Sequence, residues 1–72
     1  MSHLPRLSGT EVIKALSKAD FHVKGRARHG VVMRHDDGRR VVVPLHPELD
    51  RGMLHEIIKE SGLTRKQFME LL

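Results

Sequence analysis

Two runs of β-branched residues constrain this chain most strongly, because an Asp-Gly pair lies between them. The runs are Val31-Val32-Met33 and Val41-Val42-Val43, and Asp36-Asp37-Gly38 separates them. β-Branched side chains favour strands, and Asp-Gly favours the tight turn of a hairpin. The pattern therefore predicts two antiparallel strands, over residues 29–35 and 39–43.

The segments before this hairpin predict a helix and a third strand. Ser8 and Glu11 stand at the spacing of a capping box, and apolar residues follow at helical spacing, which predicts a helix over residues 9–19. The alternation of Phe21-His22-Val23-Lys24 predicts a short strand. The following Gly25-Arg26-Ala27-Arg28 is expected to be a flexible basic turn.

Two more helices are predicted after the hairpin. Asp50 as N-cap and Gly62 as left-handed C-cap enclose an apolar stripe, which predicts a helix over residues 51–61. Thr64 and Gln67 repeat the capping-box spacing and open a last short helix. Its inward-facing residues are expected to be Phe68, Leu71 and Leu72. The order α-β-β-β-α-α predicts the α+β class, with helices packed on one face of a three-stranded antiparallel sheet and the other face open.

Length and residue types exclude several classes of protein. The 72 residues suffice for one small domain over residues 1–72 with a thin core. The chain has no cysteine, which excludes disulfides and thiol catalysis and fits a cytoplasmic location. No apolar run approaches the roughly 18 residues of a membrane span. No phosphate-loop, dinucleotide or helical zinc motif occurs, so we expect no cofactor.

The positive charge is concentrated in the middle of the chain. Thirteen Lys and Arg residues against nine Asp and Glu residues give a net charge of +4, and six of these basic residues lie between positions 24 and 40. Such a segment is typical of a protein that binds a polyanion. The candidate RNA-binding residues are Lys24, Arg26, Arg28, Arg34, His35, Arg39 and Arg40.

The six histidines raise the question of a metal site or of acid–base catalysis. No pair has a tight ligand spacing, so we expect no metal. Those interpreted as solvated surface residues are His3, His22 and His55. His29, His35 and His46 flank the basic segment. A neutral imidazole can take a proton from a hydroxyl near pH 7, as cleavage of RNA through its own 2′-OH requires.

Three blocks of the sequence resemble the HicA-type mRNA interferase toxins. Residues 7–16 resemble the opening of that family, Arg34 to His46 resemble its central RHPDGR…VPxH stretch, and Gly52 to Phe68 resemble its GTLRSILKQAGLSREEF ending. The resemblance implies a fold similar to the double-stranded-RNA-binding domain. It also implies cleavage of mRNA and neutralisation by a HicB-type antitoxin.

One departure from the family concerns its catalytic residue. The family usually carries Gly-Ser-His at the start of the second strand, whereas this chain has Arg28-His29-Gly30 there. A glycine therefore stands at the catalytic position, and the histidine comes one residue early. Because strand side chains alternate, the shift places His29 on the face of Val31 and Met33, toward the helices. His29 avoids that face if it precedes the regular pleat or if Gly30 carries a bulge.

Three hypotheses follow for the function. The first is a toxin that cleaves mRNA without metal, with His29 as general base and His46 as general acid. The second is a non-enzymatic RNA-binding member that has lost the catalytic position at Gly30. The third is a module whose basic face binds only an acidic protein partner. We also expect an imidazole introduced at position 30 to be sterically tolerated, as on an open strand face.

Overall fold

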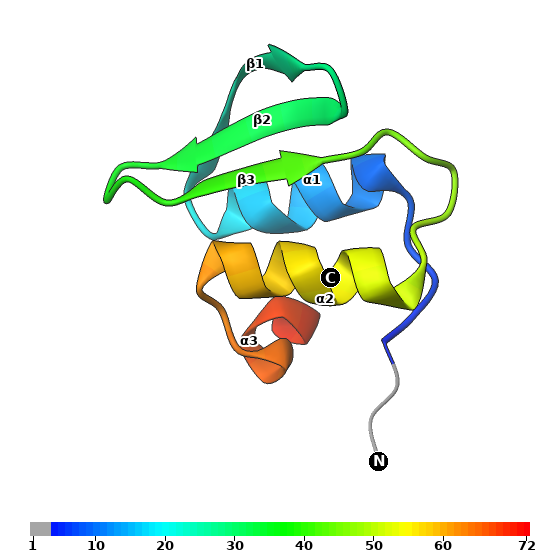
Figure 1. Cartoon of the computed structure of the whole chain (residues 1–72). Coiled ribbons are helices and arrows are strands. Elements are labelled where there is room, and N and C mark those ends of the chain that lie inside the picture. The colour runs from blue at the N-terminus through cyan, green and yellow to red at the C-terminus, as the bar shows by residue number, and fades with distance from the viewer. Residues whose placement is uncertain (1–3) are drawn as a thin grey trace.

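The computed structural model confirms the predicted order of elements and the α+β class (Figure 1). It describes residues 4–72, so the interpretation of His3 lies outside the described residues. The elements are α1 (Gly9–Lys18), β1 (Phe21–Ala27), β2 (Gly30–His35), β3 (Arg40–Val43), α2 (Arg51–Ser61) and α3 (Arg65–Glu70).

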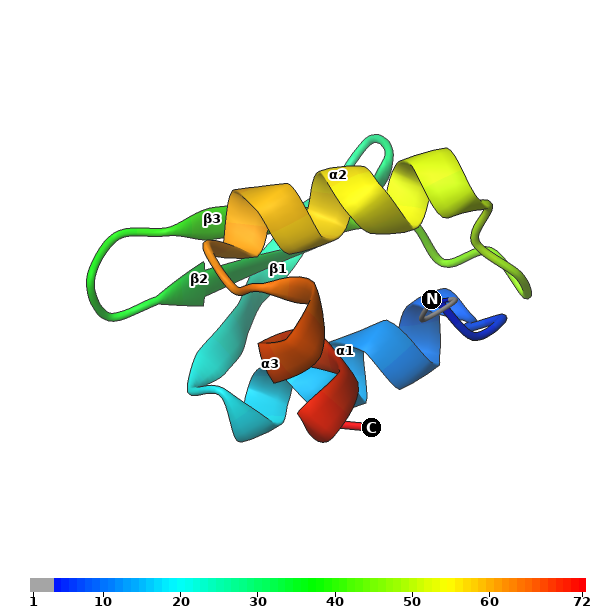
Figure 2. The same cartoon turned by 90° about the horizontal axis from the view of Figure 1, so that it is seen from below.

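The core lies between one face of the sheet and the helices. The sheet has the order β1-β2-β3 and is antiparallel throughout. Helices α1 and α2 lie side by side on one face, and α3 lies on the side of these helices away from the sheet (Figures 1 and 2). Fully buried side chains from both layers fill the space between them, among them Leu16, Phe21, Met33, Val41, Ile57 and Phe68.

The opposite face of the sheet is open, as predicted. Arg34 in β2 pairs with His22 in β1 and with Arg40 in β3, and all three residues are exposed. The alternate residues of β2, Val31 and Met33, are buried beneath the sheet. The alternation along β2 therefore separates a basic outer row from the core.

Strand β1 is longer than the sequence predicted. Val23 pairs with Met33 and Gly25 pairs with Val32, so Lys24 is an extra residue in a β-bulge. Pairing with β2 then continues to Ala27, in the segment that was predicted to be a flexible turn. Hydrogen bonds to the neighbouring strand outweigh the turn propensity of this polar segment, and the turn shrinks to residues 28–29.

Capping interactions confirm where the helices begin. Ser8 with Glu11 and Thr64 with Gln67 each form both hydrogen bonds of a capping box. Gly62 ends α2 with a left-handed φ of 75°. The expected burial of the last residue is wrong, because α3 ends at Glu70 and the side chain of Leu72 is 47% exposed.

Arg39 ties the tip of the β2–β3 hairpin to the end of α2. Its Nε donates to Asp37 Oδ2 at 2.8 Å, and its Nη1 donates to the backbone carbonyl of Ser61. The guanidinium also lies 5.3 Å from the ring centroid of Phe21, which meets His35 edge-on at 5.2 Å. The backbone N–H of Arg39 donates to the Asp37 carboxylate, and this bond is the main cause that lowers the pKa of that carboxyl.

Replacing Arg39 by methionine tests this structural role. We expect Arg39→Met to lower the free energy of unfolding by about 1–3 kcal/mol, because bonds made by a charged donor are lost. The adjacent Arg40 is exposed, so Arg40→Met should change the same quantity by less than about 0.5 kcal/mol. Urea denaturation measures both variants. Equal destabilisation by the two changes would contradict the assignment.

Candidate active-site pocket

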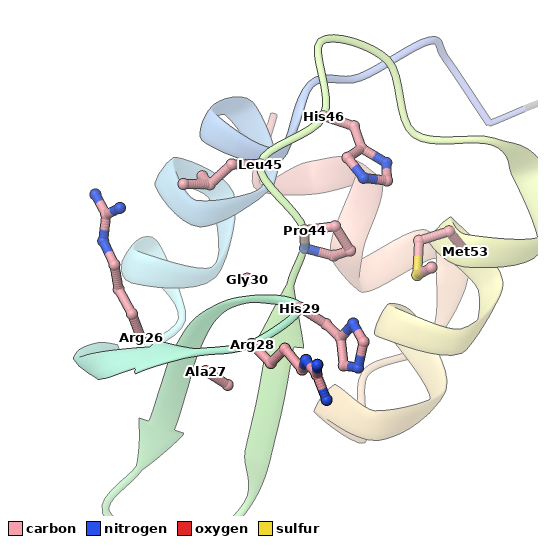
Figure 3. Close-up of a pocket in the computed structure, with 9 residues that line it drawn as sticks. All are labelled: Arg26, Ala27, Arg28, His29, Gly30, Pro44, Leu45, His46 and Met53. Atoms are coloured by element: carbon pink, nitrogen blue, oxygen red, sulfur yellow. The ribbon is translucent and has the colours of Figure 1, made fainter.

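A cavity of about 530 Å³ opens where the β1–β2 turn meets the end of β3 and the start of α2 (Figure 3). It is lined by Arg26, Ala27, Arg28, His29, Gly30, Pro44, Leu45, His46 and Met53. The pocket therefore combines both histidines predicted to be catalytic with two of the central arginines.

His29 reaches the pocket because it lies in a turn and not in the strand. Ala27 pairs with Gly30 and closes the hairpin, which leaves Arg28 and His29 as the two turn residues. Because His29 precedes the regular pleat, it does not join the buried face of Val31. This is the first of the two routes by which the sequence allowed its exposure. Figure 3 shows the imidazole on the same side of the pocket as Met53.

His46 lies in a loop that is fastened to the start of α1 and to the segment just before it. The backbone N–H of Gly9 donates to the carbonyl of His46 at 3.0 Å, and the N–H of Leu49 donates to the carbonyl of Leu7 at 2.8 Å. These two bonds fasten the loop after β3 to the start of the chain's first helix. The position of His46 therefore depends on a segment almost forty residues away in the sequence.

Two glycines allow the backbone to pack tightly around the end of β3, Gly30 in the pocket lining and Gly9 outside it. A β-carbon on Gly30 would lie 2.2 Å from the carbonyl oxygen of Val43, and one on Gly9 would lie 2.0 Å from that of Pro44. Neither position has room for a side chain. The expectation that an imidazole is tolerated at position 30 is therefore wrong, because the contact is with backbone of β3 and not with solvent.

Met53 forms the wall that α2 contributes. Asp50 caps α2 by accepting a hydrogen bond from the Met53 N–H at 2.7 Å, which places Met53 in the first turn. The helical spacing of Met53 predicts a core position. In the structure the residue is half-buried and lines the pocket. No feature of the sequence marks Pro44 and Leu45 as pocket residues. The one local signal of this site in the sequence is Gly30, because a glycine within a strand pattern is a sign of close backbone approach.

The polar groups of the pocket are free to meet a ligand. Its lining holds no carboxylate. Within residues 4–72, neither Arg26 nor Arg28 forms an ion pair, and neither imidazole of His29 and His46 forms a hydrogen bond or an ion pair. Two cations and two unengaged imidazoles around one cavity suit an anionic ligand.

The other predicted site residues lie outside the pocket. Arg34 and Arg40 belong to the open face of the sheet, and Lys24 is exposed at the bulge of β1. His35 and Arg39 belong to the hairpin tip, where both contact Asp37. The described part of the chain contains no cluster of three side chains able to hold a metal ion. It also contains no helix long and apolar enough to cross a membrane.

These observations define a small basic α+β protein with a histidine-lined pocket at one end of its sheet. The chain matches the family described as the HicA toxin of bacterial toxin–antitoxin systems over residues 9–63. Because this match covers more than half of the chain, the protein belongs to the HicA toxin family. Membership implies an antitoxin partner. A search of curated proteins found no match.

The close packing of Gly30 predicts that a single methyl group added at this position strongly lowers the free energy of unfolding. Gly25 and Gly30 have nearly the same φ, 151° and 153°, but a β-carbon on Gly25 would meet nothing within 4 Å. Gly25→Ala should therefore cost only backbone strain, about 1–3 kcal/mol. Gly30→Ala should cost about 1–3 kcal/mol more, because it also forces Val43 and Pro44 to move. Unfolding in urea compares the two, and equal costs would refute the close approach.

Proposed function

We propose that this HicA-family toxin cleaves mRNA in the cytoplasm by a metal-independent endonucleolytic reaction. The observation that carries the proposal is that His29 and His46, from two different segments, line one cavity together with Arg26 and Arg28. Membership of the HicA toxin family supports the proposal. The absence of a carboxylate from the lining favours a phosphate ligand.

The proposed chemistry uses the two imidazoles as base and acid. His29 accepts the proton of a ribose 2′-OH, and the 2′-oxygen attacks the adjacent phosphorus. The bond from phosphorus to the 5′-oxygen breaks, and protonated His46 donates a proton to that oxygen. The products are a 2′,3′-cyclic phosphate and a 5′-hydroxyl. Arg26 and Arg28 stabilise the negative charge that develops on the phosphoryl oxygens.

The remaining basic residues are proposed to hold the RNA on either side of the cleaved bond. Arg34 and Arg40 form a row across the open face, and Lys24 projects from the edge strand. We place His35 and Arg39 at the border of this surface, because both already contact Asp37. A HicB-type antitoxin is the proposed protein partner.

One observation favours a second candidate function. Gly30, which stands where the family's catalytic histidine is expected, packs so closely against Val43 that it has no room for a side chain. In this second candidate function, the protein binds RNA without cutting it. The alternative requires that His29, one residue earlier, does not act as the base.

Substitution of His29 separates the two candidates. We expect His29→Ala to lower the rate of RNA cleavage about 10²- to 10⁴-fold, the usual size of a general acid–base contribution. RNA affinity should change little, because a neutral imidazole adds little beside the arginines. The measurements are cleavage of a synthetic mRNA in EDTA, analysis of the product ends, and filter binding.

His55→Ala is the matched control for this experiment, because His55 is exposed on α2 and does not line the pocket. It should leave the rate of cleavage unchanged. A wild-type protein that is folded and binds RNA but cuts none of several unrelated mRNAs would establish the non-enzymatic candidate. Cleavage that needs a divalent ion would reject the mechanism.

The salt dependence of binding tests the role of the pocket arginines. For single-stranded RNA, log K falls with log salt at a slope of roughly −0.7 per phosphate contact. Replacing Arg26 and Arg28 together by alanine should therefore flatten the slope by about 1.4. Replacing Lys59 and Lys66, which are exposed on α2 and α3, removes the same charge and should flatten it much less. An equal change in both variants would mean that net charge alone governs binding.

A further inference from the structure

We propose that Met53, beside the buried Pro44, forms a nucleobase subsite next to the two imidazoles. The subsite would hold the base of the nucleotide whose ribose supplies the attacking 2′-OH. This inference rests on the proposed function and adds a substrate contact to it.

The half-buried side chain of Met53 lies next to the histidines and away from Arg26. Figure 3 shows Pro44 and Met53 on the same side of the strand end as the rings of His29 and His46. Leu45 and Arg26 lie toward the opposite side in the same view. A ligand whose phosphate lies at the imidazoles therefore meets an apolar surface directly beside its ribose.

The cavity is larger than a phosphate group needs. Pockets for small organic ligands range from about 300 to 1,000 Å³ and combine apolar walls with a few polar groups. The cavity of about 530 Å³ lies within that range and has this composition. Its size and its mixed lining fit a nucleotide unit better than a bare phosphate.

Met53 packs against the edge of the core without being enclosed by it. Leu54, Ile57 and Ile58 on the same helix are buried and complete its apolar face, whereas Met53 remains half-buried. Asp50 fixes the backbone of Met53 at the pocket by capping α2. The side chain therefore keeps apolar surface available at the cavity.

A thioether suits the face or edge of a base. Methionine sulfur makes favourable contacts with aromatic rings, and its flexible side chain adapts to different ring shapes. The chain has neither tyrosine nor tryptophan, and both phenylalanines are buried, so none of these larger rings is available to stack on a base. The subsite should therefore accept any base, with modest differences between purines and pyrimidines.

The test is an NMR titration of the wild-type protein carrying ¹³C-labelled methionine methyl groups. Adenosine 3′-monophosphate is the probe, and inorganic phosphate is the matched ligand without a base. With the nucleotide, the ring current of the base should shift the Met53 methyl signal upfield. Inorganic phosphate should move the ring signals of His29 and His46 but leave the Met53 methyl signal in place. Met33 is fully buried and serves as the internal reference.

Paired variants show whether the contact contributes to affinity. Met53→Ala should weaken binding of adenosine 3′-monophosphate about 2- to 10-fold and leave the affinity for inorganic phosphate unchanged. Met69→Ala is the control, because Met69 is also half-buried but lies on α3, outside the pocket.

Equal shifts of the Met53 methyl signal with both ligands would overturn the subsite, and so would equal losses in the two variants. A nucleotide that binds no better than phosphate would also overturn it. None of these results would affect the cleavage assays on His29, so the subsite can fail while the proposed function stands. Conversely, loss of the cleavage function would leave the nucleotide titration fully interpretable.

Discussion

The candidate site depends on one constraint, which is that the segment after β3 is packed closely between two glycines. Gly30 approaches the carbonyl of Val43 from β2, and Gly9 approaches the carbonyl of Pro44 from α1. A methyl group on either glycine would overlap backbone atoms that cannot move independently of the sheet or the helix. The segment is therefore held from both sides, and the loop that carries His46 starts from a fixed point.

This arrangement explains how a thin-cored protein builds a pocket from three distant segments. The β1–β2 turn supplies His29, the loop after β3 supplies His46, and the first turn of α2 supplies Met53. Backbone hydrogen bonds from Gly9 to His46 and from Leu49 to Leu7 join the loop to the start of α1 and to the segment before it. These bonds fix the path of the main chain that carries His46.

Neighbouring basic residues serve different purposes in this structure. The Arg39 guanidinium is engaged by Asp37 and the Ser61 carbonyl, while Arg40, one residue later, is exposed on the open face. Arg28 adjoins the pocket because the turn is only two residues long. A charge count along the chain groups these arginines together, but the strand register and the hairpin tip divide them among three surfaces.

The amino-acid sequence by itself determined the elements whose cause is local. Capping boxes, the left-handed Gly62 and the Asp-Gly hairpin depend on residues within a few positions of each other, so the α-β-β-β-α-α order was predictable. Only the tertiary structure decided the extension of β1, the packing of Gly30 and the placement of His29 and His46 in one cavity. Each of these features depends on contacts between residues far apart in the chain. No local sequence pattern shows that a β-carbon added to a glycine would lie about 2 Å from the backbone of a distant segment.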